Sequence, residues 1–321
     1  MQRTLYMNEL YILSQIIKAH PRYTLDSFRW QETYLRLAAS NELNPDGLMA
    51  GLKIHWPDMY QYLDKNQTLA KELKESLRPL QLLGIQLLCF GENDYPTECY
   101  RMEDPPLTLS YWGEPAWKKG PALAVVGSRE PQRESLEWME QDLAPFIEKE
   151  KICVVSGGAR GVDQKSHSIA LRKKVPTLVI LPSGLGEFYP ANLKEWIQPV
   201  FSVGGAFISE YDYQQRMHKH LFHHRNRLIA ALGRASLIVE ARKRSGTLIT
   251  AQQAAQLGRP VWVVPGHPRD PNFQGSLDLL SEGAQLVRDA QDLSMFFHSE
   301  LESEKLSPVQ IGVNLELSPY I

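Results

Sequence analysis

Short apolar runs alternate with polar or glycine-rich turns from about residue 120 onward. The runs are ALAVV (122–126), ICVV (152–155), TLVIL (177–181), AFIS (206–209), SLIVE (236–240) and VWVV (261–264). Amphipathic segments of helix length, such as ESLEWMEQDLAPFIEKE and GTLITAQQAAQLG, lie between them. Uninterrupted apolar strands that alternate with helices are typical of a parallel sheet covered on both faces. The pattern therefore predicts an α/β fold, a doubly wound, mostly parallel, Rossmann-like sheet.

The first 80 residues follow a different pattern. Apolar residues recur there at helical spacing, and prolines separate the segments. A change of pattern near residue 84, where IQLLCF (85–90) predicts a strand, marks the boundary. We expect a small helical domain over 1–80, an extended Rossmann-like domain over 81–290, and a short tail over 291–321. The tail has little apolar pattern, and we expect it to be partly disordered.

Composition narrows the class of protein. The 321 residues carry a net charge of −2, so any basic surface has to be local. Three cysteines at irregular spacing favour neither a disulfide framework nor a zinc site. No signal peptide is evident, and no apolar run approaches the roughly 20 residues that span a bilayer. We expect a soluble, cytoplasmic protein that does not contact membranes.

The unusual residues follow the predicted strands directly. An unusual segment comes after each strand end, namely GSR (127–129), SGGARGVD (156–163), PSGLGEFYP (182–190), the long loop from Glu210 to Phe222, ARKRSGT (241–247) and PGH (265–267). In open parallel sheets ligands bind outside the carboxyl ends of the strands. These segments should converge on one edge of the sheet and form a site there.

The chemistry of this edge suits anions. SGGARG places glycines and backbone amides at a helix start, where a phosphate binds readily, although the same glycines also serve a plain strand-to-helix turn. Neither GxGxxG nor GxxxxGK[ST] is present, which disfavours dinucleotide-dependent redox chemistry and P-loop nucleotide hydrolysis.

Positive charge gathers in the same region. Residues 216–244 contain eight arginines and lysines against Glu240 alone, a local charge of +7. Within this run, KHLFHHRNRLIAAL (219–232) places Phe222 among basic residues. Phe222 either stacks on a nucleic-acid base, a contact worth ~1–3 kcal/mol, or packs as a hydrophobic staple on its own helix.

Four histidines crowd this segment, at 218, 220, 223 and 224. No Cys, Asp or Glu within the cluster completes a familiar ligand set, so we expect no metal and favour a solvated or phosphate-contacting role. We also find no serine or cysteine nucleophile paired with a base. The pattern predicts neither a cofactor nor an enzyme.

Taken in order, the motifs resemble one known family. GSR, SGGARGVDQKSH, GEFYP, ISE, FHHRNRLIAAL, VEARKRSGTLITAQQA, VPG and QGSLDLLSEGA occur in the order of the DNA processing protein A (DprA, or Smf) family. The resemblance covers about residues 84–288. It implies a dimeric protein that binds single-stranded DNA during natural transformation, protects it, and loads the RecA recombinase. That role is sequence-independent binding, with no catalysis.

The resemblance also assigns the site. Arg129 and Lys219 would neutralise phosphates, and Phe222 would stack on a base. Asn226 would contact the strand or act as a structural hydrogen-bonder. The expected DNA-contacting set is Gly127, Ser128, Arg129, Gly157, Gly158, Arg160, Lys219, Phe222, Arg225, Asn226, Arg227 and Arg244.

Departures from the family pattern limit the comparison. The tail after residue 290 is too short for the winged-helix domain with which family members often end. The N-terminal helices occupy the position of a SAM-like domain but lack an obvious glycine-rich hairpin.

The rival hypothesis is a nucleotide-binding or nucleoside-monophosphate-cleaving enzyme similar to the lysine-decarboxylase-like phosphoribohydrolases. In those enzymes a PGGxGTxxE motif carries the catalytic glutamate, and this chain has Thr250 at the equivalent position. A nucleotide-sensing module with the same fold is a third hypothesis.

Overall fold

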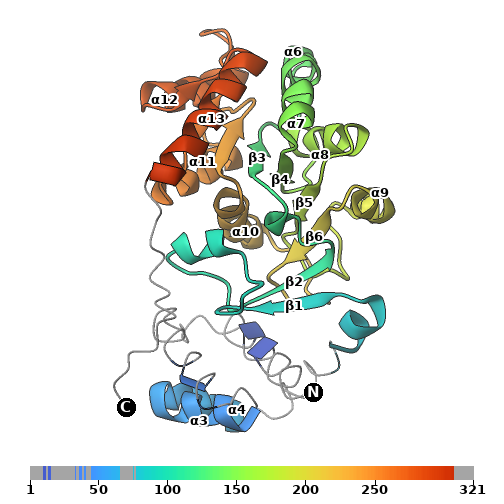
Figure 1. Ribbon diagram of the computed structural model, residues 1–321, viewed down its shortest axis with the longest axis vertical. Coiled ribbons are helices and arrows are strands. Elements are labelled where there is room, and N and C mark those ends of the chain that lie inside the picture. The colour runs from blue at the N-terminus through green and yellow to red at the C-terminus, as the bar shows by residue number, and fades with distance from the viewer. Residues whose placement is uncertain are drawn as a thin grey trace.

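The computed structural model describes residues 45–65, 75 and 77–306, together with residues 10, 11, 14, 15, 33, 36, 37 and 40. A nine-stranded sheet in the order β1-β2-β6-β5-β4-β3-β7-β8-β9 organises this part of the chain (Figure 1). The strands are β1 (Gln86–Cys89), β2 (Thr108–Gly113), β3 (Ala122–Val126), β4 (Cys153–Ser156), β5 (Thr177–Ile180), β6 (Ala206–Ser209), β7 (Ala235–Ile238), β8 (Val261–Val263) and β9 (Gln285–Leu286). The predicted α/β, Rossmann-like fold class is confirmed.

The six predicted strands form the parallel centre of the sheet. Strands β3 to β8 pair in parallel, and β3 lies between β4 and β7. The chain therefore winds outward in one direction from β3 through β6 and then restarts at β7 on the other side of β3. This reversal is the topological switch point, the place where open α/β sheets hold their ligands. The antiparallel strand β2, which the sequence pattern did not predict, joins β1 to β6.

Helices cover both faces of the sheet because the strand side chains are buried on both sides. The helices after β2 are α6 (Arg133–Trp138), α7 (Ala144–Glu150), α8 (Val162–Arg172), α9 (Ile197–Ser202), α10 (Lys219–Leu232), α11 (Gly246–Gln256), α12 (Gln274–Ser281) and α13 (Ala290–Leu306), with a π-helical turn, Met139–Leu143, between α6 and α7. One face of β3 packs through Leu123 and Val125 with residues of α7, α8 and α13. Its other face packs through Ala124 and Val126 with residues of α10 and α11.

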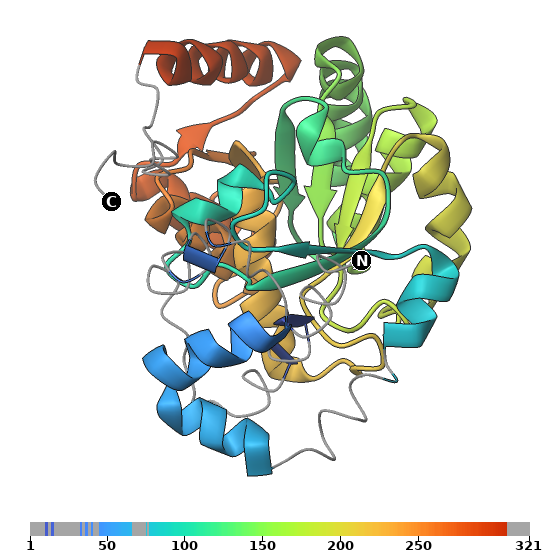
Figure 2. The same ribbon diagram turned by 60° about the horizontal axis from the view of Figure 1, so that its bottom comes forward.

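Helix α13 occupies the first part of the tail that was expected to be partly disordered. Residues 290–306 form this helix, which runs across the top of the view in Figure 2. Leu293 and Phe297 anchor it, and the Phe297 ring lies edge-on to Phe146 of α7, with 5.8 Å between the centroids. Two apolar residues one turn apart were too weak a signal to predict this docking from the sequence. Residues 307–321 lie outside the described residues.

The N-terminal region contributes α3 (Pro45–His55) and α4 (Pro57–Lys65), which lie beyond β1 and β2 in Figure 1. Leu10, Leu37 and Leu52 belong to the same buried apolar cluster as Leu88 and Leu109 of the sheet. The described N-terminal residues thus share a core with the sheet. The division into a helical domain over 1–80 and a sheet domain over 81–290 stays a proposal.

Candidate nucleic-acid interface

A cavity of about 860 Å³ opens at the switch point between β3 and β7. Its wall combines the turn after β3, Ala159 and Asp163 after β4, the start of α10, and the loop after β7 with the start of α11. Val126 and Ile229 contribute apolar surface, whereas Arg129, Lys219 and Arg242 bring positive charge. The cavity therefore offers an apolar interior and a cationic lining, a combination that suits a ligand with both a ring and a phosphate.

The GSR turn is held by close packing against α8. A Cβ at Gly127 would lie 2.7 Å from Cγ2 of Val162, so only glycine permits this approach. The Val162 amide donates to the Ser128 carbonyl over 3.1 Å, and Thr247 at the start of α11 donates to the Gly127 carbonyl over 3.1 Å. These contacts fix the backbone of the turn, and Arg129 extends from it as an exposed side chain.

The SGGARG loop is arranged differently from the phosphate loop that its glycines suggested. The Gly157 and Ala159 amides donate to the Asp163 carboxylate over 3.2 and 3.3 Å. Burial raises the pKa of Asp163, while the nearby Arg225 charge and these amides lower it. Two of the amides expected to hold a phosphate therefore hold a carboxylate of the protein itself. Gly157 and Gly158 are buried and do not line the cavity.

Arg225 lies beneath the cavity and is only 3% exposed. Its guanidinium donates to the Ile180 carbonyl and faces Asp163, and burial lowers its pKa. A Cβ at Gly157 would overlap this guanidinium, which explains the glycine at that position. Arg225 therefore contributes to the cavity wall as a buried side chain, and it does not extend to solvent as a free phosphate ligand would.

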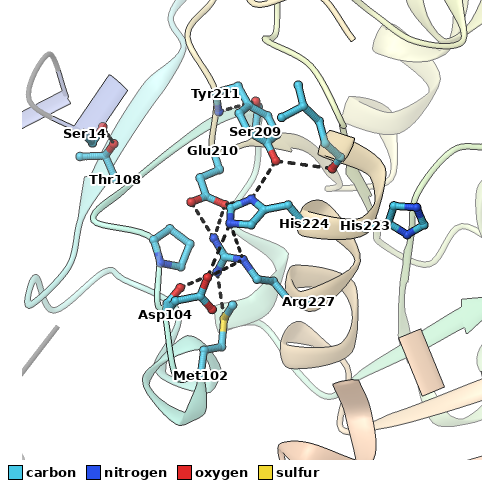
Figure 3. Close-up of polar contacts among 12 residues, drawn as sticks. Ser14, Met102, Asp104, Thr108, Ser209, Glu210, Tyr211, His223, His224 and Arg227 are labelled. Carbon is cyan, nitrogen blue, oxygen red and sulfur yellow. Dashed lines mark hydrogen bonds and ion pairs between the residues drawn. The ribbon is translucent and has the colours of Figure 1, made fainter. Parts of the chain in front are cut away.

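Arg227 lies in a buried polar network away from the cavity (Figure 3). Its Nη2 donates to both Glu210 carboxylate oxygens over 2.7 and 2.6 Å, and its Nη1 donates to the Asp104 carbonyl over 2.6 Å. His224 accepts from its Nε over 3.2 Å. These partners occupy the guanidinium, and its side chain is only 9% exposed, so they favour a structural role, while the expected phosphate contact of Arg227 stays a prediction.

Asn226 follows the structural alternative raised by the sequence. Its side-chain amide donates to the Gly246 carbonyl over 3.4 Å, which ties α10 to the start of α11. Asn226 is 9% exposed and also lines the cavity, so one side chain both joins two helices and contributes to the wall.

Phe222 projects from the first turn of α10 at the cavity rim and is half-buried. The Arg129 guanidinium carbon lies 5.2 Å from the centre of its ring, and that of Arg225 lies 5.9 Å away. The Tyr189 ring meets it edge-on, with 5.5 Å between centroids and 81° between planes. Phe222 is thus in contact with Arg225 of its own helix and with residues of two other loops, those after β3 and β5.

The structure brings most of the predicted site together. The predicted residues that line the cavity are Gly127, Ser128, Arg129, Lys219, Phe222, Arg225 and Asn226. Those that do not line it are Gly157, Gly158, Arg160, Arg227 and Arg244. Whether any of them contacts DNA stays a prediction.

Sequence reasoning missed several wall residues. Arg242 lines the cavity where Arg244 had been expected, because Arg244 turns the chain at a φ of +59°. Met217 and the start of α11, Ser245 to Thr247, also line it. The basic run signalled the loop, but only the turn geometry decides which of its arginines faces inward.

The histidine cluster forms no metal site among the residues that the structure describes. His218 and His220 stack with 5.9 Å between their centroids, and His218 and His223 line the cavity. Within the same described ranges, no helix is both long and apolar enough to cross a membrane.

A Rossmann-like sheet with a cationic, aromatic cavity at its switch point defines a class of ligand-binding α/β proteins suited to phosphate-bearing ligands. Within this class the chain belongs to the DNA recombination-mediator protein A family, whose model matches residues 86–298. The DNA processing protein DprA of Streptococcus pneumoniae is 35% identical over 199 residues, which cover 62% of this chain and 70% of that protein. Protein Smf of Synechocystis is 30% identical over 230 residues, 68% of this chain and 57% of that protein.

Two solved structures resemble this one along most of its length. The X-ray structure of DprA from Streptococcus pneumoniae has a TM-score of 0.72 at 26% identity, covering 90% of this chain and 97% of that one. The DprA structure from Helicobacter pylori, described for its single-stranded DNA binding mode, has a TM-score of 0.58 at 29% identity. It covers 68% of this chain and 96% of that one.

Proposed function

We propose that this protein binds single-stranded DNA without sequence preference, and that the strand enters the cavity at the switch point. The observation that carries the proposal is the joint placement of Arg129, Lys219 and Arg242 with the Phe222 ring around one cavity. Cations neutralise phosphates whatever the sequence, and every base has a face on which an aromatic ring stacks.

The wider role follows from membership of the family. We propose that the protein acts in natural transformation, where it protects incoming strands and loads RecA onto them, as a cytoplasmic homodimer. The relative from Helicobacter pylori, described as binding single-stranded DNA, supports the first part of this role.

The arrangement favours binding over bond cleavage. Thr250 lines the cavity at the position where the rival phosphoribohydrolase hypothesis needs a carboxylate. Asp163 also lines the cavity, but it is buried and its carboxylate accepts hydrogen bonds from the Gly157 and Ala159 amides of its own loop. We therefore propose a binding protein that is not an enzyme. Release of free base from nucleotides by the purified protein would contradict this.

A titration of labelled single- and double-stranded oligonucleotides at two salt concentrations tests the binding proposal. We expect single-strand affinity that falls steeply with salt and depends little on base composition. Arg129→Ala and Lys219→Ala should each weaken binding, because each removes a cation from the cavity rim. Wild-type affinity in both variants would refute the site.

A further inference from the structure

Tyr189 is an exposed aromatic residue in the loop after β5. Its side chain is 40% exposed, whereas its neighbours Phe188 and Leu193 are 7% and 0% exposed. The loop is thus anchored by buried apolar residues on both sides, and it presents a single large ring to solvent. Tyr189 does not line the cavity.

Tyr189 lies next to Phe222, which places its exposed ring close to the cavity rim. The two rings meet edge-on at 5.5 Å, and Phe222 lies on the cavity rim. Phe222 therefore separates the cavity from Tyr189. A strand that leaves the cavity across Phe222 meets a second aromatic ring directly beyond it.

The loop is fixed to the neighbouring loop after β4. Gln164 of α8 donates to the Gly158 carbonyl over 3.1 Å and exchanges hydrogen bonds of 3.4 Å with Asn192. Leu193 packs closely over Gly158. The SGGARG loop carries Arg160, an exposed cation outside the cavity. Ala159, the neighbour of Arg160, lines the cavity, so an aromatic ring and a cation lie on two joined loops at the cavity edge.

We propose that Tyr189 is a second stacking platform for single-stranded DNA, so that the bound strand runs from the cavity over Phe222 onto the loops after β5 and β4. Aromatic rings that hold successive bases, beside cations that follow the backbone, are the usual means of binding single strands without sequence preference. The proposal rests on the proposed function, and it adds a direction and a length to the binding path. It requires the ring of Tyr189 and does not require its hydroxyl.

The test compares Tyr189→Leu with the matched variant Tyr189→Phe in the full chain, using fluorescence anisotropy with oligo-dT of increasing length. Tyr189→Leu should bind the shortest oligonucleotides as the wild type does. It should bind those long enough to pass Phe222 about 5-fold to 150-fold more weakly, the range for one lost base stack. Tyr189→Phe should restore binding. A 2-aminopurine base placed along a longer strand should be quenched by the wild type and Tyr189→Phe at one position where Tyr189→Leu does not quench it.

The outcomes separate this proposal from the function on which it rests. If the wild type binds no oligonucleotide, both fall. If the wild type binds and Arg129→Ala weakens binding at every length, but Tyr189→Leu matches the wild type throughout, only the second platform falls. An equal loss in Tyr189→Leu at every length would also overturn it, because Tyr189 would then merely support Phe222. Equal thermal unfolding midpoints check that the exposed substitution leaves the fold intact.

Discussion

At the scale of single residues, burial decides what each polar side chain does. The motif SGGARGVD offers glycines and backbone amides that suit a bound phosphate, although the same glycines also serve a plain strand-to-helix turn. In the structure two of its amides donate to the Asp163 carboxylate, and the Arg225 guanidinium occupies the position where a side chain at Gly157 would lie. Arg225 comes from a helix more than sixty residues later in the chain. A local motif cannot reveal such a partner, so sequence reasoning assigned those amides to a ligand.

His167 shows the same effect with a consequence for stability. The ring is fully buried, and its Nδ1 lies 2.6 Å from Thr177 Oγ1. The threonine hydroxyl donates to the Val154 carbonyl, so the histidine donates to the threonine. Burial, followed by the charge of Arg225, lowers the pKa of His167 to about 3. The folded protein holds this ring neutral at a pH where the unfolded chain protonates it.

We therefore expect His167 to make the protein less stable in acid. Between its unfolded pKa of about 6.5 and its folded pKa, the unfolded state binds the extra proton. The free energy of unfolding should fall by up to about 1.4 kcal/mol for each pH unit lost. Urea denaturation of the wild type and His167→Asn at pH 7.5, 6 and 5 measures this. The variant should be less stable at pH 7.5 and show a smaller decline on acidification. Parallel declines in both proteins would contradict the assignment.

At the scale of elements, α10 joins the cavity to the rest of the protein. Its apolar residues were predicted to face the core, and Leu228, Ile229 and Leu232 are indeed buried. The charged residues between them could not be placed from the sequence, because a charge run looks alike whether it faces solvent or a buried carboxylate. Arg227 pairs with two carboxylates from distant segments. Glu210 directly follows β6, and Asp104 precedes β2.

Removing one partner of this network should destabilise the fold more than it weakens DNA binding. Arg227→Ala leaves the Glu210 carboxylate buried without its cation, a loss of about 3–5 kcal/mol in related cases. The double variant Arg227→Met, Glu210→Leu removes both charges and should recover much of that stability. Chemical denaturation of the two variants and the wild type provides the comparison. If Arg227→Ala keeps wild-type stability and loses DNA affinity, Arg227 is a phosphate ligand after all.

At the scale of the whole molecule, the sequence pattern predicted the parallel centre of the sheet, where strands and helices alternate regularly. The six predicted parallel strands, β3 to β8, lie within one or two residues of their expected positions, because strands buried on both faces are uniformly apolar. Two strands outside this set, β2 and β9, were not predicted. Strand β2 is half-exposed at Tyr111 to Gly113, and β9 has only two residues, both exposed, so neither shows a clear periodicity. The convergence of strand ends predicted where the cavity lies but not which side chains turn into it.

The difference between the net charge of the whole chain and the local charge of the cavity yields a prediction for DNA binding by the intact protein. With a net charge of −2, the chain has no overall attraction for a polyanion, so affinity should depend on cations that line the cavity. Arg242 and Arg244 form a matched pair, since both are exposed on one loop and only Arg242 lines the cavity. Arg242→Gln should weaken binding and lower the slope of log affinity against log salt by about 1.

Arg244→Gln is the control, because it removes an identical charge two residues away. It should leave both the affinity and the salt slope close to those of the wild type, since a cation outside the cavity displaces few counterions from the bound strand. Anisotropy titrations at four or more salt concentrations measure the slopes. Equal losses in the two variants would mean that the whole basic loop attracts DNA from outside. The cavity would then not be what confines the strand.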